Sequence, residues 1–385
     1  MKRFCSIVTL LFAALVGIVA QDLSSEGKDS SGPFLSSDTV ANPRTGFPAA
    51  VQQRTVEFFQ GELRKFNDID TTYIEPQHYN FAVMLQNTNT YEIYSLRSEA
   101  GQSIRFAPRP TYRVGPYFGW RWLFLGYTFD VRHLSNESKK TEFDLSIYSN
   151  LLSLDLYYRK TGNDYYIREI DLRGIGRRRL DHVAFDGLNV GITGVNIHYI
   201  FNHQKFSYPA AFSQSTVQRK SCGSALAGIG FTRHSIHLDY KRLEQVVREN
   251  VPELHGDDDV IVVDSSLSFD KVKYTDISLS GGYAYNWVPA RNWLVAGSLS
   301  LALGYKRSSG ALRKDERTLL TDFSFRNLSV DGIGRFAIVW NDTKWYAGMN
   351  AILHAYTYKK RQLSANNFFG TLNFYVGFNF GRKKE

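Results

Sequence analysis

Apolar and polar residues alternate along the last strand-like run of the chain, Thr371–Phe380. Large apolar residues occupy every second position from Leu372 to Phe380, and the residues between them are mostly polar or small. A period of two is that of a β-strand with one apolar and one polar face. About ten residues is also the length with which a tilted strand crosses a bilayer core. The run therefore predicts a strand of a soluble sandwich, with its apolar face inside, or of a membrane barrel, with that face toward lipid.

The same alternation recurs through most of the chain from Tyr79 onward, for example in 122–131, 152–159 and 295–306. Ionisable residues such as Asp155 and Arg159 fall on the polar faces of these runs. They would be costly in a closed sandwich core, whereas a wet lumen tolerates them. The pattern favours an all-β fold, an antiparallel up-and-down transmembrane β-barrel. Long helical patterns do not alternate with these runs, which argues against a parallel α/β enzyme.

Turn-forming residues separate the predicted strands. Compact connections are predicted at 149–150, 161–164, 287–292 and 341–344, and longer ones at 132–140, 173–186, 241–270 and 307–322. A membrane barrel alternates short periplasmic turns with long outer loops. Only the connection at 161–164 interrupts this rhythm. Roughly 25 residues per strand and connection predict about twelve strands, with about ten to fourteen allowed.

The N-terminus carries the signs of an exported chain. Lys2 and Arg3 precede an apolar segment, Ile7–Val19, and a small residue, Ala20, stands before Gln21. This pattern predicts a signal peptide over 1–20. No later stretch approaches the eighteen or so apolar residues of a membrane helix, so insertion would be as a barrel. The expected order is then a disordered leader (21–50), a short amphipathic helix and connector (51–69), the β-barrel (70–381) and a basic tail (382–385).

Composition and charge narrow the function classes. The formal charge is +9, but the basic residues gather where strand-like runs end or are interrupted. They therefore predict exposed loops and no nucleic-acid partner. Phe, Tyr and Trp make up 15% of the chain, and barrels use such residues as girdles at both membrane interfaces. Cys222 would be the only cysteine left after cleavage, so neither a disulfide within the chain nor a thiolate metal cluster is expected, and no metal or cofactor is predicted.

Two groups of residues are candidates for chemistry or binding. Ser235, His237 and Asp239 share one predicted strand face and are the residue types of nucleophile, base and acid in a hydrolase. Strand neighbours two apart lie roughly 7 Å from each other with parallel side chains, so this catalytic hypothesis is weak, and a polar row at the lumen or rim is favoured. The predicted lumen or binding residues are Trp122, Asp130, Asp155, Tyr157, Arg159, Arg177, Arg178 and Arg179. The three consecutive arginines would contact lipid head groups or another anionic ligand, or form a solvated loop.

Two segments resemble a known family. They are Asp70–Ile74 (DTTYI) and Val114–Asp130 (VGPYFGWRWLFLGYTFD), of which the second, with its Gly-Pro-Tyr and Gly-Trp pairs, is the more specific. The chain resembles, from Asp70 to Phe380, the family called domain of unknown function 4421, exported proteins of Bacteroidota. The resemblance implies an outer-membrane barrel pattern and no assigned activity. One departure is that Gly381–Glu385 follows Phe380, whereas such barrels commonly end on an aromatic residue.

The leading functional hypothesis is a non-enzymatic outer-membrane barrel. It would serve as a narrow channel, a binder of small solutes or lipids, or a surface-loop receptor. The expected partners are outer-membrane lipid, the barrel assembly machinery and a small solute or anionic lipid as ligand. Two alternatives stay open: a barrel-embedded hydrolase of lipid or peptide, and a soluble periplasmic β-protein with an interaction role.

Overall fold

The computed structural model describes the chain from Ile69 to Lys383 with several gaps. The described residues are 69–120, 123–126, 129–130, 141–161, 164–173, 175–251, 263–264, 267, 271–310, 328–360 and 363–383. All of them belong to one compact unit, 58–385. The predicted signal peptide (1–20), the leader (21–50) and all but the last residue of the predicted helix and connector (51–69) lie outside the described residues.

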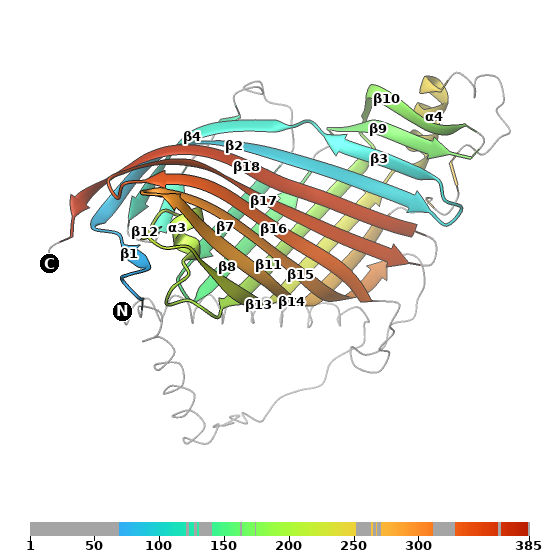
Figure 1. Ribbon diagram of the computed structural model, residues 1–385. Coiled ribbons are helices and arrows are strands. Elements are labelled where there is room, and N and C mark those ends of the chain that lie inside the picture. The colour runs from blue at the N-terminus through green and yellow to red at the C-terminus, as the bar shows by residue number, and fades with distance from the viewer. Residues whose placement is uncertain are drawn as a thin grey trace, which may run out of the picture. The chain divides into compact units, whose positions relative to one another are not determined.

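A long curved sheet forms the wall of this unit (Figure 1). In order of pairing its strands are β5 (Leu123–Gly126) and β6 (Phe129–Asp130), which both pair with β4 (Thr111–Trp120), then β2 (Tyr79–Ser98), β18 (Leu363–Arg382), β17 (Trp345–Lys360), β16 (Leu328–Asn341), β15 (Trp293–Gly310), β14 (Lys271–Ala290), β13 (Cys222–Leu238), β11 (Leu188–Ile200), β8 (Leu152–Lys160) and β7 (Thr141–Tyr148). Every pairing is antiparallel, as predicted. Among the described strands, no ladder joins β5 or β6 to β7.

Five further strands and two helices lie outside this wall. β3 (Ser103–Pro108), β9 (Tyr165–Leu172) and β10 (Gly176–Phe185) branch from β2, whose first half pairs with β4 and whose second half pairs with β3. β1 (Ile74–Pro76) and β12 (Thr216–Gln218) form a separate two-stranded sheet. The helices are α3 (Tyr208–Phe212) and α4 (Tyr240–Asn250). The described residues thus hold eighteen strands, more than the ten to fourteen predicted, because alternation does not distinguish the thirteen strands of the wall from the five outside it.

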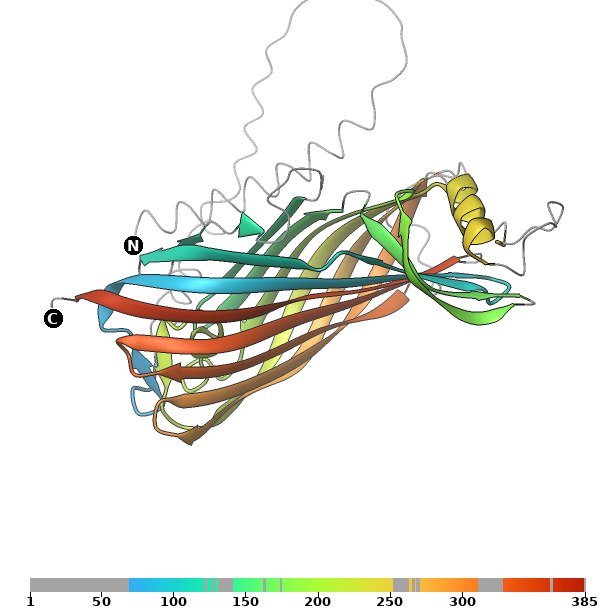
Figure 2. The ribbon, with the colours of Figure 1, turned by 90° about the horizontal axis from the view of Figure 1, so that it is seen from above.

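The register assigns each connection to one of two ends of the wall. The start of β2 and the end of β18 define the terminal end, and the branch and α4 lie at the opposite, distal end (Figure 2). Short connections follow β7, β14 and β16 at the terminal end, whereas the long intervals 239–270 and 311–327 join distal strand ends. The connection at 161–164 leads from the wall strand β8 into the branch strand β9. It therefore does not break the predicted alternation of short and long connections.

The wall carries its apolar side chains on the convex face. On β14, Ile277 and Leu279 are exposed, Leu279 to 70%, while Asp276 and Ser278, which alternate with them, are buried on the concave side. The closing run behaves in the same way, since Phe374, Val376 and Phe380 are exposed and the intervening Tyr375 and Asn379 are buried. This sidedness is the reverse of that in a soluble sandwich. None of the described helices has the length and apolar character of a membrane span.

Arg382 and Lys383, the first two residues of the predicted basic tail, contact the start of β2 and the residue before it. β18 continues to Arg382, which pairs with Tyr79, one residue beyond the predicted barrel boundary at 381. The Lys383 N–H donates to the His78 carbonyl at 2.8 Å. Phe380 stacks on Phe81 with ring centroids 5.5 Å apart. Residues beyond 383 lie outside the described part.

Candidate functional site

A buried ion pair crosses the space that the curved wall encloses, which we call the lumen. Asp155 lies on β8 and Arg335 on β16, with four other wall strands between them along the sheet. The Arg335 guanidinium donates to Asp155, whose other carboxylate oxygen accepts from Ser146 Oγ at 2.7 Å. Both side chains are buried, with exposed fractions of 0% for Arg335 and 6% for Asp155. The polar faces of the strands therefore meet each other inside the wall.

Tyr157 makes a second contact across the lumen. Its hydroxyl hydrogen bonds with Tyr356 on β17 and lies 3.1 Å from Thr232 Oγ1 on β13. The absence of a side chain at Gly194 on β11 leaves room for the Tyr157 ring, which a Cβ there would strike. Tyr157, one of the predicted lumen residues, is buried.

Arg159 and a series of stacked rings fill the lumen between Tyr157 and the distal end. The Arg159 guanidinium lies 4.5 Å from the Phe369 ring centroid and donates to Asp144 at 3.0 Å. Phe369 stacks on His354 at 4.8 Å. A second stack places Tyr274 between His234, at 4.4 Å, and Tyr358, at 4.3 Å. The concave face is thus occupied by the protein's own side chains.

A second group of buried charges lies on β14, β15 and β16. Lys306 Nζ donates to Asp331 Oδ1 at 2.8 Å and to the Thr357 carbonyl at 2.6 Å. Asp276 stands opposite Lys306 in the register, on the same buried side. Sequence reasoning placed Lys306 on a polar strand face but did not single out Asp331 or Arg335. Glycines interrupt the alternation between those two residues, and the partner of Arg335 lies on a strand far away in the sequence.

The connection between β11 and β13, residues 201–221, folds inward at the terminal end; together with β1 we call it the terminal plug. The helix α3 begins after Ser207, whose hydroxyl accepts from the Ala210 N–H, and has a proline in its first turn. Ala210 and Ala211 pack in one apolar cluster with side chains of β15 and β16. These side chains are Leu294, Ala296, Ala337 and Val339.

Hydrogen bonds also fasten the terminal plug to the wall. Asn286 Nδ2 on β14 donates to the Ser207 carbonyl at 2.8 Å and to Gln218 Oε1 at 3.0 Å. Gln214 Nε2 donates to the Tyr375 hydroxyl on β18 at 2.7 Å. Since β14 and β18 are on different parts of the wall, the terminal plug is held from several directions.

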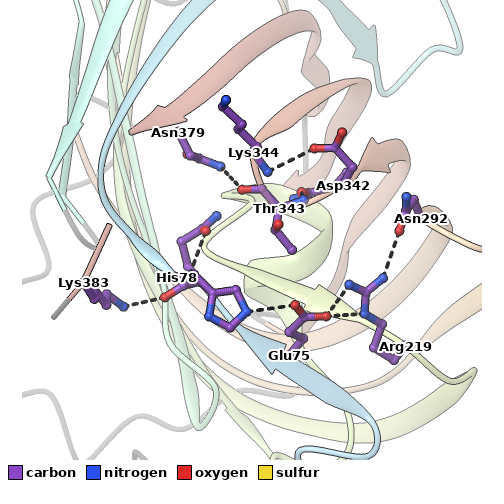
Figure 3. A network of polar contacts seen from close by, with 11 residues as sticks. Glu75, His78, Arg219, Asn292, Asp342, Thr343, Lys344, Asn379 and Lys383 are labelled. Carbon is purple, nitrogen blue, oxygen red and sulfur yellow. Dashed lines mark hydrogen bonds and ion pairs between the residues drawn. The ribbon is translucent and has the colours of Figure 1, made fainter. Parts of the chain in front are cut away.

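A polar network at the terminal end joins β1 to the connection between β14 and β15 (Figure 3). Glu75 forms an ion pair with Arg219, whose Nη1 donates to Asn292 Oδ1 at 2.9 Å. His78 Nε2 lies 2.9 Å from Glu75 Oε1. Burial alone would raise the pKa of Glu75, but the hydrogen bonds from His78 and Arg219 hold that pKa below its usual value.

Acid is expected to weaken the attachment of β1. Because the folded-state pKa of Glu75 is lowered, its contribution to stability is present above its usual value of 4.5 and is lost as the pH falls through the lowered value. Glu75→Gln should therefore lower the urea midpoint at pH 7, and this difference from the parent protein should shrink at about pH 3. An equal difference at both pH values would contradict the assigned role of the carboxylate.

The distal end is filled by an apolar cluster. It joins branch residues such as Ile104, Phe106 and Ile170 to Leu243 and Val247 of α4. Asp239 caps α4 by accepting from the Arg242 N–H at 3.0 Å. The lumen is therefore bounded by protein side chains at both ends.

The structure separates the predicted lumen residues into three groups. Asp155, Tyr157 and Arg159 lie on the concave side and are buried. Trp122 and the side chain of Asp130 lie outside the described part, although the backbone of Asp130 pairs with Arg113 in β6. Arg177–Arg179 do not line the lumen, because they are exposed on the branch strand β10, where Arg177 Nε lies 3.3 Å from Glu169 Oε1. That part of the prediction was wrong, since the residues belong to a strand outside the wall.

The candidate catalytic row does not form a relay. Ser235 and His237 fall on the convex face of β13, the same face as the exposed Arg233, while the Asp239 carboxylate caps α4. These three groups therefore do not converge on one point, as nucleophile, base and acid must. No cluster of three or more His, Cys, Asp or Glu residues suited to a metal occurs among the described residues.

The chain belongs to the family described as "Domain of unknown function (DUF4421)", which matches residues 68–380. No curated protein matches it. Similar solved structures include the outer membrane protease OmpT from Escherichia coli, at 7% identity over 78% of this chain and 97% of that chain, with a TM-score of 0.33. The translocator domain of the autotransporter NalP from Neisseria meningitidis is 10% identical over 86% and 97%, with a TM-score of 0.31. At these TM-scores neither likeness carries an argument about this chain.

Proposed function

We propose that this protein is an outer-membrane β-barrel without an open channel, which presents its distal branch and α4 outside the cell as a binding surface. The observation that carries the proposal is the sidedness of the wall. Apolar side chains are exposed on the convex face, and polar side chains contact one another across the lumen. In water such a face would be an aggregation site, whereas lipid solvates it.

Aromatic residues support the bilayer placement. Trp287, Trp293 and Trp345 are all exposed on the convex face, and each lies next to a short connection at the terminal end. Indole rings prefer the interface between hydrocarbon and head groups, where membrane barrels carry their aromatic girdles. These tryptophans would mark one edge of the hydrocarbon layer.

The wall strands suffice for a closed barrel. If β5 and β6, which pair with successive parts of β4, are taken as one interrupted strand, the wall has twelve. We infer that β6 and β7 close it, because only closure removes the two open edges that a bilayer does not tolerate. Membrane barrels place short turns in the periplasm and long connections outside. The terminal plug then faces the periplasm.

The filled lumen favours a binder or receptor over a channel. The terminal plug, the Asp155–Arg335 pair and the aromatic stacks succeed one another between the two ends. Twelve strands lie between the eight-stranded barrels whose interiors side chains fill and the porins of about sixteen strands that hold an aqueous channel, and here side chains occupy the interior. The distal surface is then the part that offers groups to an external ligand.

A silent bilayer is the expected result of conductance measurements. The purified protein, reconstituted in a planar bilayer, should give no ion-selective steps, while a wide porin in the same setup should conduct. Heat-modifiable migration of the same sample would establish that a folded barrel is present. Regular conductance steps from the heat-modifiable protein would overturn the closed-lumen proposal.

A further inference from the structure

Two polar residues, Asn87 and Asn89, interrupt the apolar convex face of the wall in the middle of β2. The neighbouring positions of β2 on this face, before and after them, carry large and exposed side chains: Val83, Leu85, Tyr91 and Ile93. In the register, Asn87 stands between Val114 of β4 and Phe374 of β18. The two asparagines are therefore surrounded by large, mostly apolar side chains along the strand and across it.

In the proposed membrane setting, these asparagines lie at the depth of the hydrocarbon layer. Phe81 stacks on Phe380 at the terminal end. Because a tilted strand crosses the bilayer core in about ten residues, a span that begins at Phe81 ends near Tyr91. Asn87 and Asn89 fall within this span. Lipid tails offer no hydrogen-bonding groups, so a polar side chain at this depth needs a protein partner.

The wall itself satisfies only part of the hydrogen-bonding capacity of the two carboxamides. Asn89 Nδ2 donates to Asn87 Oδ1 at 2.6 Å and to the Leu372 carbonyl at 3.2 Å. Asn87 Nδ2 donates to the Arg113 carbonyl at 3.2 Å. A carboxamide has two N–H groups and an oxygen that can accept two bonds. Within the described part, one N–H of Asn87 and the Oδ1 atom of Asn89 thus have no partner.

The two carboxamides lie lower than the side chains around them. Asn87 is half-buried and Asn89 is 5% exposed, whereas Leu85 and Tyr91 beside them are 53% and 46% exposed. The asparagines thus occupy a shallow recess in the convex face. A lipid tail that filled this recess would leave the N–H of Asn87 and the Oδ1 atom of Asn89 unpaired, which is costly in an apolar medium.

We propose that a second copy of this chain docks on this face, which consists of Leu85, Asn87, Asn89, Tyr91 and Phe374 and which we call the asparagine face. The proposal rests on the proposed placement of the barrel in a membrane. One unpaired donor and one unpaired acceptor make the asparagine face complementary to itself, as a two-fold interface requires. Asparagine side chains hydrogen bond between membrane-embedded segments in this way. Both copies would have the same orientation in the bilayer, so equal residues would meet at equal depth.

Sedimentation equilibrium of the full chain in a density-matched neutral detergent measures the dissociation constant of the dimer. The asparagine variant is Asn87→Val with Asn89→Val. The matched control is Asn189→Val with Asn366→Val, at two convex positions nearer the distal end. Two symmetric hydrogen bonds between membrane-embedded side chains correspond to roughly a tenfold or greater change in this constant. We expect a dimer at least about tenfold weaker for the asparagine variant and an unchanged one for the control.

Cross-linking in lipid vesicles tests the same face without altering the asparagines. In a Cys222→Ser background, the variant Leu85→Cys should form a disulfide between two copies when molecular iodine is added as the oxidant. Leu279→Cys is the matched control, because Leu279 is also exposed on the convex face but lies on β14, with four wall strands between it and β2. It should form no such disulfide.

Three results would overturn the proposal. They are equal dissociation constants for the asparagine variant and the control, equal cross-linking at positions 85 and 279, or a cross-linked product in native outer membranes whose mass is not twice that of the chain, which would indicate a different partner. Heat-modifiable migration is measured on all samples. If the parent protein is heat-modifiable but monomeric, only the dimer is wrong. If it shows no heat-modifiable form, the proposed barrel itself fails.

Discussion

Replacing Leu279 by Arg is expected to destabilise the protein in a bilayer by about 2–4 kcal/mol, the range for a basic residue near the midplane of a lipid-facing strand. Leu279 lies midway along β14 on the convex face and is 70% exposed. In the proposed setting this exposure is to hydrocarbon, so the guanidinium would have to leave water. In a water-soluble protein, the same substitution at so exposed a position would change stability by no more than about 0.5 kcal/mol.

The folded fraction in lipid vesicles as a function of urea, read from heat-modifiable migration, measures this effect. Leu279→Phe is the matched control, because it changes size but keeps the side chain apolar, and it should fold like the parent. Folding of Leu279→Arg with an unchanged urea midpoint would be incompatible with a lipid-facing convex side.

Removing Arg335 should destabilise the fold by about 3–5 kcal/mol, because Asp155 would be left charged and buried without its partner. We propose Arg335→Met, which retains an unbranched side chain of similar length. The double variant Asp155→Leu and Arg335→Met should recover most of the loss, since apolar replacement of a buried pair is often neutral or better. Urea titration of both variants and of Asp155→Leu alone measures the coupling between the two positions.

An exposed ion pair serves as the control for this experiment. Arg242 Nε lies 3.4 Å from Asp186 Oδ1, and both side chains are substantially exposed. Arg242→Met should therefore cost only about 0–1 kcal/mol. If Arg335→Met were as mild as Arg242→Met, or if the double variant were no better than Arg335→Met alone, the cross-lumen pair would not have the assigned role.

The sidedness of the strands could be predicted from the sequence because it is a local property. A period of two in 371–380 and 152–159 separates the two faces whatever the strand pairs with. The alternation assigned Asp155, Tyr157 and Arg159 to one strand face, and all three are buried in the structure. The long connections predicted at 241–270 and 307–322 agree with the intervals between β13 and β14 and between β15 and β16, whereas the connection predicted at 173–186 was wrong, because that segment contains the strand β10.

Partners and branches could not be predicted in the same way. Asp155 and Arg335 are 180 residues apart, and only the curvature of the wall brings them together. Three consecutive arginines, Arg177–Arg179, give no alternation, so a connection was predicted where the branch strand β10 lies. The terminal plug has no strong helical period, since α3 has only five residues and is held by capping and packing. Each of these features depends on tertiary contacts.

The most direct test of the central claim is the accessibility of spin labels along residues 276–280 of β14. Single cysteines would be introduced in a Cys222→Ser background, because Cys222 is the free cysteine of the described part and would take up label. In a bilayer, labels at 277 and 279 should show high access to oxygen and low access to a water-soluble nickel chelate, whereas labels at 276, 278 and 280 should show low access to oxygen. Two results would contradict a barrel that turns its apolar face to lipid. One is high access of the nickel chelate to labels at 277 and 279, and the other is greater oxygen access at 276, 278 and 280 than at 277 and 279.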